Sequence, residues 1–417
     1  MTRQRRRLIL LASTSLSALA LGGAAPVLAA CSTSPTNTAA VSCITTVAPG
    51  GFQQFTGLSA PNTNALTRLD GEAATGAERG ALLLMDDFLT LLLDPFTNGR
   101  TIIGPTGGAT GFAPPGLPSG APGYMPVKSA PGAVAPTFDQ RWYAWGAGFG
   151  RSGTANGDPT IGSTTVTAST FAYAAGMDYR IDAGRSVGFA LAGGGVGWNL
   201  AQGLGSGRGD SFLAGIYGRN SFGPGYLGAA LAFGNHWFET DRTSFDADRL
   251  TSRFDGQSFG ARVEAGWRFA VAPGLGMTPY GVFQAQTFHT ESHDETDLTG
   301  GGFALDYDAL SATDTRAEVG GRFDQLTYLG SQPLLLRGRL AYAHDWVTDP
   351  SLGAAFVTLP GSNFLVTGAE IPRNSAIIEL GAELKIDGNW SFMTKFDGQF
   401  ATGAQILGGT GVLRYTW

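Results

Sequence analysis

Three serines in this 417-residue chain lie in motifs that nucleophilic enzymes use. Ser186 and Ser258 are each at the centre of a G-x-S-x-G motif, and Ser211 lies in Gly209-Asp210-Ser211-Phe212. A nucleophile elbow needs a turn between a strand and a helix, together with a histidine and an acid. None of the three serines precedes a predicted helix, and a chain with 63 glycines produces such motifs by chance. A surface hydrolase that uses one of them is therefore kept only as an alternative.

A second pattern has the residue types of a metal site. His289 and His293 are four positions apart, among the carboxylates of the segment 289–297. Imidazole and carboxylate groups at this spacing are able to bind a divalent cation. A solvated acidic loop has the same composition, and that is the interpretation we adopt. The sequence thus predicts no catalytic residue, no cofactor and no metal.

The remaining charged residues alternate with apolar ones, which indicates β-strands. Within 252–270, Phe259 and Val263 alternate with Arg262 and Glu264, so the two kinds of side chain lie on opposite faces. Strands of soluble sandwiches usually have about 5–6 residues. The three alternating segments at the C-terminus are more than twice as long, at 372–386, 389–401 and 405–417. A tilted strand needs about 9–11 residues to cross a bilayer. Long strands with one apolar and one charged face favour a transmembrane barrel.

Turn residues divide the chain after Phe138 into twelve predicted strands, at 140–150, 168–181, 186–199, 208–220, 225–239, 252–270, 276–290, 311–325, 332–346, 372–386, 389–401 and 405–417. Long and short connections alternate between them, except for the last, as outer loops and periplasmic turns do in outer-membrane barrels. We predict an all-β fold: a 12-stranded antiparallel transmembrane β-barrel with an N-terminal α-helix threading its pore.

Charges of both signs are predicted to line a hydrated interior. The predicted lumen-facing residues are Arg262, Glu264, Arg268, Arg316, Glu318, Arg322, Arg337, Arg339, Glu379, Glu383 and Lys385. The segments 208–220, 225–239 and 276–290 do not alternate cleanly, so the facing of their side chains is left open.

Residues 1–30 have the form of a signal peptide, with four arginines, an apolar core and small residues before Cys31. The rest of the chain has 23 basic and 33 acidic residues, which argues against nucleic acid as a partner. Cys31 and Cys43 are the two cysteines, and in an exported protein their spacing fits a disulfide loop. Leu28-Ala29-Ala30-Cys31 also fits a lipoprotein cleavage site, so lipidation of Cys31 is the alternative.

The segments between the signal peptide and the barrel differ in composition. Residues 31–63 are small and polar, which predicts a short surface peptide. Apolar residues at steps of three and four predict a helix over 64–97, slender enough in its first half for a narrow lumen. An ordinary packing helix is the alternative. Residues 98–137 form a Pro/Gly-rich linker, and 138–417 form the predicted barrel.

A helix with Leu69-Asp70-Gly71-Glu72-Ala73-Ala74, followed by twelve strands that end in Leu413-Arg414-Tyr415-Thr416-Trp417, resembles the C-terminal translocator of type V autotransporters. The resemblance covers about residues 64–417. It implies location in the bacterial outer membrane as a monomer, contact with outer-membrane lipid, and assembly by periplasmic chaperones and the barrel-assembly machinery. It also implies a pore helix that includes Glu72, Ala73, Ala77, Leu84 and Phe88, and an assembly signal made of Leu413, Tyr415 and Trp417.

Together these features predict a non-catalytic autotransporter barrel that translocates or displays a short N-terminal passenger, with the N-terminal segment at the cell surface. The alternative is a porin-like channel or an adhesin-like barrel, and a surface hydrolase is the second alternative.

Overall fold

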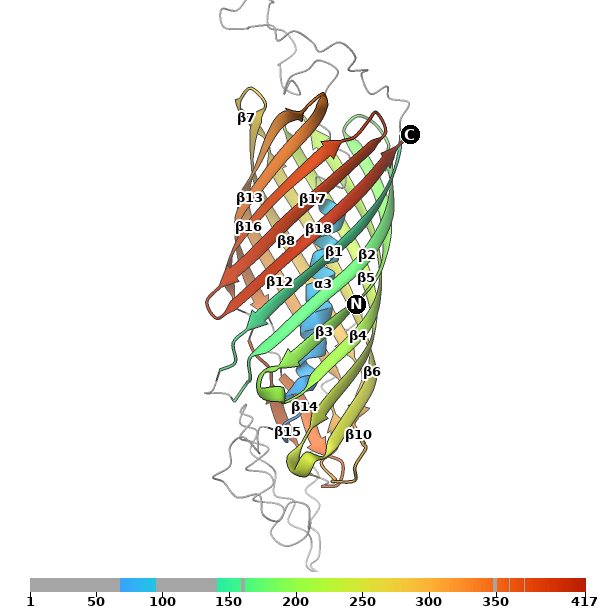
Figure 1. The fold of residues 1–417 in the computed structure, drawn as a ribbon, viewed down its shortest axis with the longest axis vertical. Coiled ribbons are helices and arrows are strands. Elements are labelled where there is room, and N and C mark those ends of the chain that lie inside the picture. Colours follow the sequence, from blue (N-terminus) through green and yellow to red (C-terminus); the bar gives the residue numbers. More distant parts are fainter. Residues whose placement is uncertain (1–67, 95–140, 159–161, 348–350, 360, 371) are drawn as a thin grey trace, which may run out of the picture.

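The protein is described by a computed structural model that covers residues 68–94, 141–158, 162–347, 351–359, 361–370 and 372–417. The predicted signal peptide at 1–30, the passenger at 31–63 with Cys31 and Cys43, and the linker at 98–137 lie outside these residues. Twelve antiparallel strands form a closed barrel around one helix (Figure 1), which confirms the predicted fold class.

The barrel strands are β1 (Trp142–Ala155), β2 (Val166–Arg180), β3 (Arg185–Leu200), β4 (Ser206–Phe222), β5 (Gly225–Thr243), β6 (Arg249–Trp267), β8 (Leu275–Thr290), β12 (Leu310–Leu329), β13 (Gln332–Val347), β16 (Asn374–Lys385), β17 (Trp390–Ala401) and β18 (Ala404–Thr416). Each pairs with the next, and β1 pairs with β18 from Tyr143↔Thr416 to Ala155↔Ala404. The barrel is closed, so its wall has no free edge.

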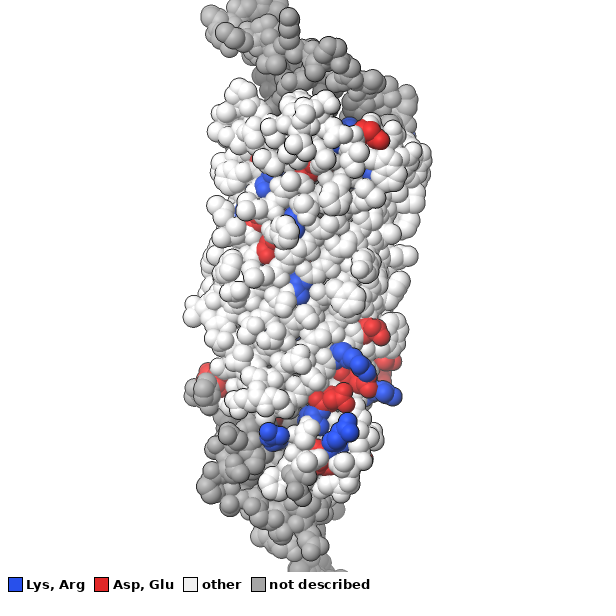
Figure 2. Space-filling view, viewed as in Figure 1, with Lys and Arg blue, Asp and Glu red and all other residues white. Residues whose placement is uncertain are grey.

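The two faces of the wall differ as lipid and water require. On β16, Leu380 points outward and is 66% exposed, whereas the neighbouring Glu379 points inward and is 8% exposed. On the face shown in Figure 2, the middle of the outer wall carries few charges, and Lys, Arg, Asp and Glu gather over the lower parts of β4–β6. None of the helices within the described ranges is long and apolar enough to cross a membrane.

The two mouths of the barrel are built differently. At one mouth, tight connections such as 223–224 and 330–331 join the strands, with the short β7 (Phe269–Ala272) beside β8. At the other mouth, the connections β8–β12 and β13–β16 form a separate four-stranded sheet, which we call the cap sheet. Its order is β15 (Phe364–Thr367), β14 (Ser351–Phe356), β11 (Leu305–Tyr307) and β9 (His293–Asp294). The cap sheet was not predicted from the sequence.

The smaller elements at the cap-sheet mouth complete the fold. There, β10 (Thr296–Asp297) pairs with β6. Two short 3-10 helices, η3 (Ala201–Gly203) and η4 (Phe245–Ala247), connect β3 to β4 and β5 to β6.

The helical segment lies inside the barrel and begins at the cap-sheet mouth (Figure 1). It consists of a 3-10 turn, η2 (Glu72–Thr75), and α3 (Gly76–Leu93). The sequence predicted a helix over 64–97, but Arg68–Asp70 form a turn and Gly71 has a φ of 69°. This left-handed conformation suits glycine, and the helical backbone therefore begins at Glu72.

The structure also gives the facing that the sequence left open on β4, β5 and β8. Leu213, Phe238 and Phe288 point inward and belong to the same apolar core as Met85 and Phe88 of α3. These strands therefore have apolar residues on both faces, and the alternation that marks a lipid-water boundary disappears.

Candidate functional site: the helix in the barrel lumen

One side of α3 lies close against β3, β4 and β6 because glycines leave room for it. A Cβ atom added to Gly215 would lie 2.5 Å from Leu92 Cδ1, and one added to Gly260 would lie 2.7 Å from Leu89 Cδ1. On the helix itself, a Cβ atom at Gly76 would lie 2.1 Å from Trp198 Cδ1. Close packing of this kind gains dispersion energy and leaves no void for water.

Four of the residues assigned to a pore helix are buried in this contact. They are Ala73, Ala77, Leu84 and Phe88.

The other side of α3 carries acids that pair with bases of the wall. Arg151 of β1 lies between two helix carboxylates, with Nη1 2.8 Å from Asp86 Oδ2 and Nε 2.6 Å from Asp87 Oδ1. Asp397 of β17 adds a third carboxylate, 3.0 Å from Arg151 Nε. At the end of the helix, Asp94 Oδ2 lies 2.6 Å from Lys395 Nζ. Buried ions are stable only when paired, so these pairs fix both the depth and the rotation of the helix.

Asp86 contacts two further side chains of the wall besides Arg151. Arg316 Nη1 of β12 lies 3.4 Å from Asp86 Oδ2, and Gln284 Nε2 donates to Asp86 Oδ1 at 2.9 Å. Arg316 also pairs with Asp345 at 2.5 Å. The carboxylate is thus held by β1, β8 and β12 together.

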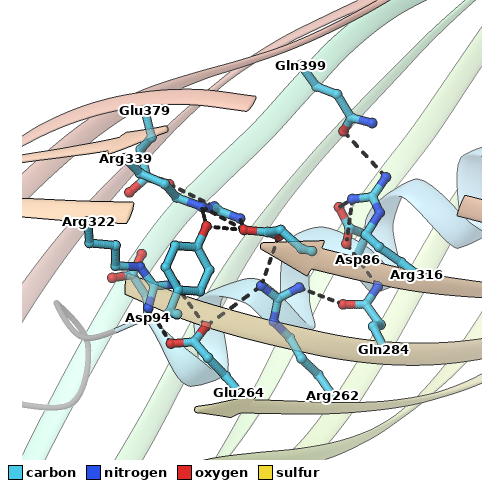
Figure 3. A network of polar contacts seen from close by, with 12 residues as sticks. Asp86, Asp94, Arg262, Glu264, Gln284, Arg316, Arg322, Arg339, Glu379 and Gln399 are labelled. Carbon is cyan, nitrogen blue, oxygen red and sulfur yellow. Dashed lines mark hydrogen bonds and ion pairs between the residues drawn. The ribbon is translucent and has the colours of Figure 1, made fainter. Parts of the chain in front are cut away.

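A continuous polar network extends from Asp86 along the lumen (Figure 3). Gln284 Oε1 accepts a hydrogen bond from Arg262 Nη1 at 2.8 Å, and Arg262 lies 3.9 Å from Glu264 and 3.7 Å from Glu318. Glu264 then pairs with Arg322. Glu318 pairs with Arg339, which reaches Glu379 at 3.3 Å. The structure brings seven of the predicted lumen-facing residues into one cluster: Arg262, Glu264, Arg316, Glu318, Arg322, Arg339 and Glu379.

The other predicted lumen residues have partners of their own. Arg268 pairs with Asp324 at 2.6 Å. Glu383 lies between Arg337 and Arg414, at 3.3 and 3.2 Å. Lys385 is half-buried at the end of β16.

Glu72 lies in η2, at the mouth of the barrel and beyond the wall that faces lipid. The backbone N–H of Thr164 donates to Glu72 Oε1 at 2.7 Å, and Asp70 is close by. Burial, with a smaller contribution from Asp70, raises the pKa of Glu72 to about 8. The carboxyl group is therefore protonated at neutral pH.

Two of the motif serines meet at one histidine. Ser211 Oγ lies 2.8 Å from His236 Nδ1, and Ser258 Oγ lies 2.8 Å from His236 Nε2. His236 and Ser258 are fully buried, whereas a nucleophile has to reach its substrate and its base is oriented by an acid. The cluster joins β4, β5 and β6 through their inner faces. Ser186 lies elsewhere, on β3 opposite Arg180.

The two histidines of the acidic segment lie apart from one another. His289 Nδ1 is 2.8 Å from Ser311 Oγ, and His293 stacks on Phe254 with 3.8 Å between the ring centroids. Among the residues that the structure describes, no three His, Cys, Asp or Glu side chains come together in a way that would hold a metal ion.

The residues proposed as an assembly signal end the last strand. Leu413 and Trp417 are exposed on the outer wall, and the Tyr415 and Trp417 rings stack with centroids 5.6 Å apart. Trp417 N donates to Trp142 O at 3.1 Å, so the contact with β1 continues one residue beyond the end of β18.

Sequence reasoning missed the partners that position the helix, above all Arg151, Gln284 and Trp198. Trp198 Nε1 donates to Ala73 O at 2.7 Å. A signal for such partners was present in Asp86-Asp87, two adjacent acids inside an otherwise apolar helical run. Buried acids require bases or donors, so this pair predicts cations on the surrounding wall.

The lipid-facing wall, the charged lumen and the helix inside it define an outer-membrane β-barrel with an occupied pore. A comparison with family models agrees, since the model of the autotransporter beta-domain matches residues 144–397, more than half of the chain. This chain belongs to the autotransporter beta-domain family, whose barrels lie in the bacterial outer membrane.

Solved structures share the fold at low sequence identity. The translocator domain of autotransporter NalP from Neisseria meningitidis matches with a TM-score of 0.53 and 12% identity, over 66% of this chain and 88% of that one. The beta domain of the Bordetella autotransporter BrkA matches with a TM-score of 0.50 and 13% identity, over 66% of this chain and 100% of that one.

Two curated relatives are both named extracellular serine protease, from Serratia marcescens. They are 23% identical over 199 residues and 24% identical over 267 residues, which are 47% and 63% of this chain. The matches cover only 19% and 25% of those proteins. The chain thus spans about a quarter or less of the length of these relatives, and their protease activity is a property of those whole proteins.

Proposed function

We propose that this barrel holds α3 in its pore and displays the chain segment that precedes Arg68 on the outer side of the outer membrane. The observation that carries the proposal is the set of ion pairs between the helix acids Asp86, Asp87 and Asp94 and bases on three different strands. They fix the helix in the lumen with its first residues at the mouth that has the cap sheet. Outer-membrane barrels keep their longer loops outside and their short turns in the periplasm, which supports this orientation.

The barrel acts as a scaffold and carries out no catalysis in this proposal. Its partners are outer-membrane lipid along the apolar wall, and periplasmic chaperones and the barrel-assembly machinery during insertion. Leu413, Tyr415 and Trp417 form the signal that this machinery binds, and the barrel works as a monomer.

An epitope tag inserted after Cys43 tests the proposal in intact cells. We expect an antibody to bind this tag without any treatment of the cells. A matched tag after Gly388, in the short turn between β16 and β17, should bind antibody only after the outer membrane is permeabilised. If antibody bound only the Gly388 tag in intact cells, the orientation would be the opposite of the proposed one, and the proposal would be wrong.

A further inference from the structure

At the cap-sheet mouth, three side chains of the barrel and the cap sheet bind the main chain just before α3. Arg242 Nη1 donates to Arg68 O at 2.8 Å, and Trp198 Nε1 donates to Ala73 O at 2.7 Å. Tyr307 Oη lies 3.2 Å from Gly71 O. All three contacts are made to carbonyl oxygens, which every residue of a polypeptide has.

Two of these donors, Arg242 and Tyr307, contact one carboxylate outside the bound segment. Glu295 binds Arg242 through two hydrogen bonds, of 2.7 Å to Nε and 2.6 Å to Nη2, and both side chains are 2% exposed. The same carboxylate lies 3.0 Å from Tyr307 Oη and accepts a hydrogen bond from Leu305 N at 2.9 Å. Glu295 is thus a positioning residue for Arg242, and it shares the single hydroxyl hydrogen of Tyr307 with Gly71 O.

The fit to the main chain is close. A Cβ atom at Gly71 would lie 2.2 Å from Tyr307 Oη and 2.6 Å from Leu305 Cδ1, and Gly71 has a φ of 69°. Leu69 is fully buried in the core of the cap sheet. The shape of the site therefore selects a glycine at 71 and an apolar residue at 69, while its polar contacts at 68 and 73 are made to the backbone.

We propose that Arg242, Tyr307 and Trp198 form a binding site for the main chain of a displayed polypeptide at the outer mouth. The site holds residues 68–73 through their carbonyl groups and accepts different side chains at 68, where Arg68 is half-buried. This inference rests on the proposed function for the identity of its ligand as the displayed segment. The site itself is defined by contacts that any orientation in the membrane would preserve.

Limited digestion with proteinase K of the purified full chain in detergent tests the site, with mass spectrometry to locate the start of the protected fragment. In the unchanged protein we expect the fragment to start no later than Leu69. Tyr307→Phe and Trp198→Phe each remove one donor and keep an aromatic ring. Loss of one hydrogen bond should speed trimming past Ala73 about tenfold.

Two controls separate backbone binding from other effects. Glu295→Gln should act like the donor variants, whereas Glu239→Gln, which alters two Arg–Glu pairs on the outer wall, should leave trimming unchanged. Arg68→Gln, which changes a half-buried side chain and keeps the carbonyl group, should also stay protected. The site would be disproved by unchanged trimming in both Tyr307→Phe and Trp198→Phe, or by equally fast trimming in Arg68→Gln.

The same digestion in intact cells separates this inference from the proposed function. If Tyr307→Phe is trimmed faster than the unchanged protein, in purified form and in intact cells, the result supports both the backbone site and the proposed orientation. If Tyr307→Phe is trimmed faster only in purified form and not in intact cells, the result supports the backbone site and contradicts the proposed orientation.

Discussion

Replacement of Asp86 by alanine is the change that most directly loosens the helix in the pore. It removes the carboxylate that Arg151, Arg316 and Gln284 share at 2.8, 3.4 and 2.9 Å. Removing one partner of a buried ion pair costs about 3–5 kcal/mol. Arg151 keeps Asp87, and Arg316 keeps Asp345, so we expect the lower end of this range, about 3 kcal/mol.

Hydrogen exchange of the α3 amides measures this loss. When an amide exchanges only after the helix leaves the wall, its rate follows the population of the released state. A cost of about 3 kcal/mol makes that population about a hundredfold larger. We therefore expect exchange in 76–93 to become about a hundredfold faster in Asp86→Ala, with little change in β16–β18.

Glu239→Ala is the matched control, because Glu239 also contacts two arginines but on the outer wall. Exposed pairs of this kind contribute about 0–1 kcal/mol, so exchange in α3 should stay as in the unchanged protein. Equal exchange of α3 in Asp86→Ala and Glu239→Ala would refute the claim that the ion pairs fix the helix. Faster exchange in all strands of Asp86→Ala would point to general unfolding.

Three further changes test other parts of the structure. Leu380→Arg places a charge on the lipid face at a cost of about 2–4 kcal/mol, so less folded barrel should reach the membrane than with Leu380→Phe; equal yields would contradict the facing of β16. Gly76→Ala should lower the free energy of unfolding by about 1–3 kcal/mol through its clash with Trp198, whereas Gly388→Ala, in open space, should have little effect. Burial raises the pKa of the Glu72 carboxyl group from its ordinary value of 4.5 to about 8. Glu72 therefore contributes its full stabilisation of the folded protein below pH 4.5, and this contribution is lost as the pH rises to about 8. Exchange in η2, corrected for the intrinsic rate, should therefore be faster at pH 8 than at pH 5, and Glu72→Gln should remove this difference.

The fold class was predictable because lipid and water impose opposite requirements on the two faces of one strand. On β16 and β17 this requirement is strict, and Leu380 and Phe396 alternate with Glu379 and Lys395. Strands of soluble proteins are usually about 5–6 residues long, so alternation that continues over twice that length favours a membrane-spanning barrel.

The contact between helix and wall was harder to predict. Where α3 lies against the wall, the inner face is as apolar as the outer one, as Leu213 and Phe288 illustrate. A period of two cannot be read from such strands. The specific pairing of Asp86 with Arg151 and Arg316 also depends on the rotation and depth of the helix, which no pattern within a single segment records.

The cap sheet was not predictable for a different reason. Its strands β9 and β11 have two and three residues, too short to show a period. They are stabilised by long-range contacts instead. Tyr307 contacts both Gly71 and Glu295, and these contacts form only when the barrel brings the segments together.

Conductance of the purified protein in planar lipid bilayers tests the central claim, that α3 occupies the pore of a closed barrel. The unchanged protein should conduct only rarely. A variant that lacks residues 68–94 should form long-lived open channels of uniform conductance. Open channels of the same size and frequency in both proteins would contradict the account.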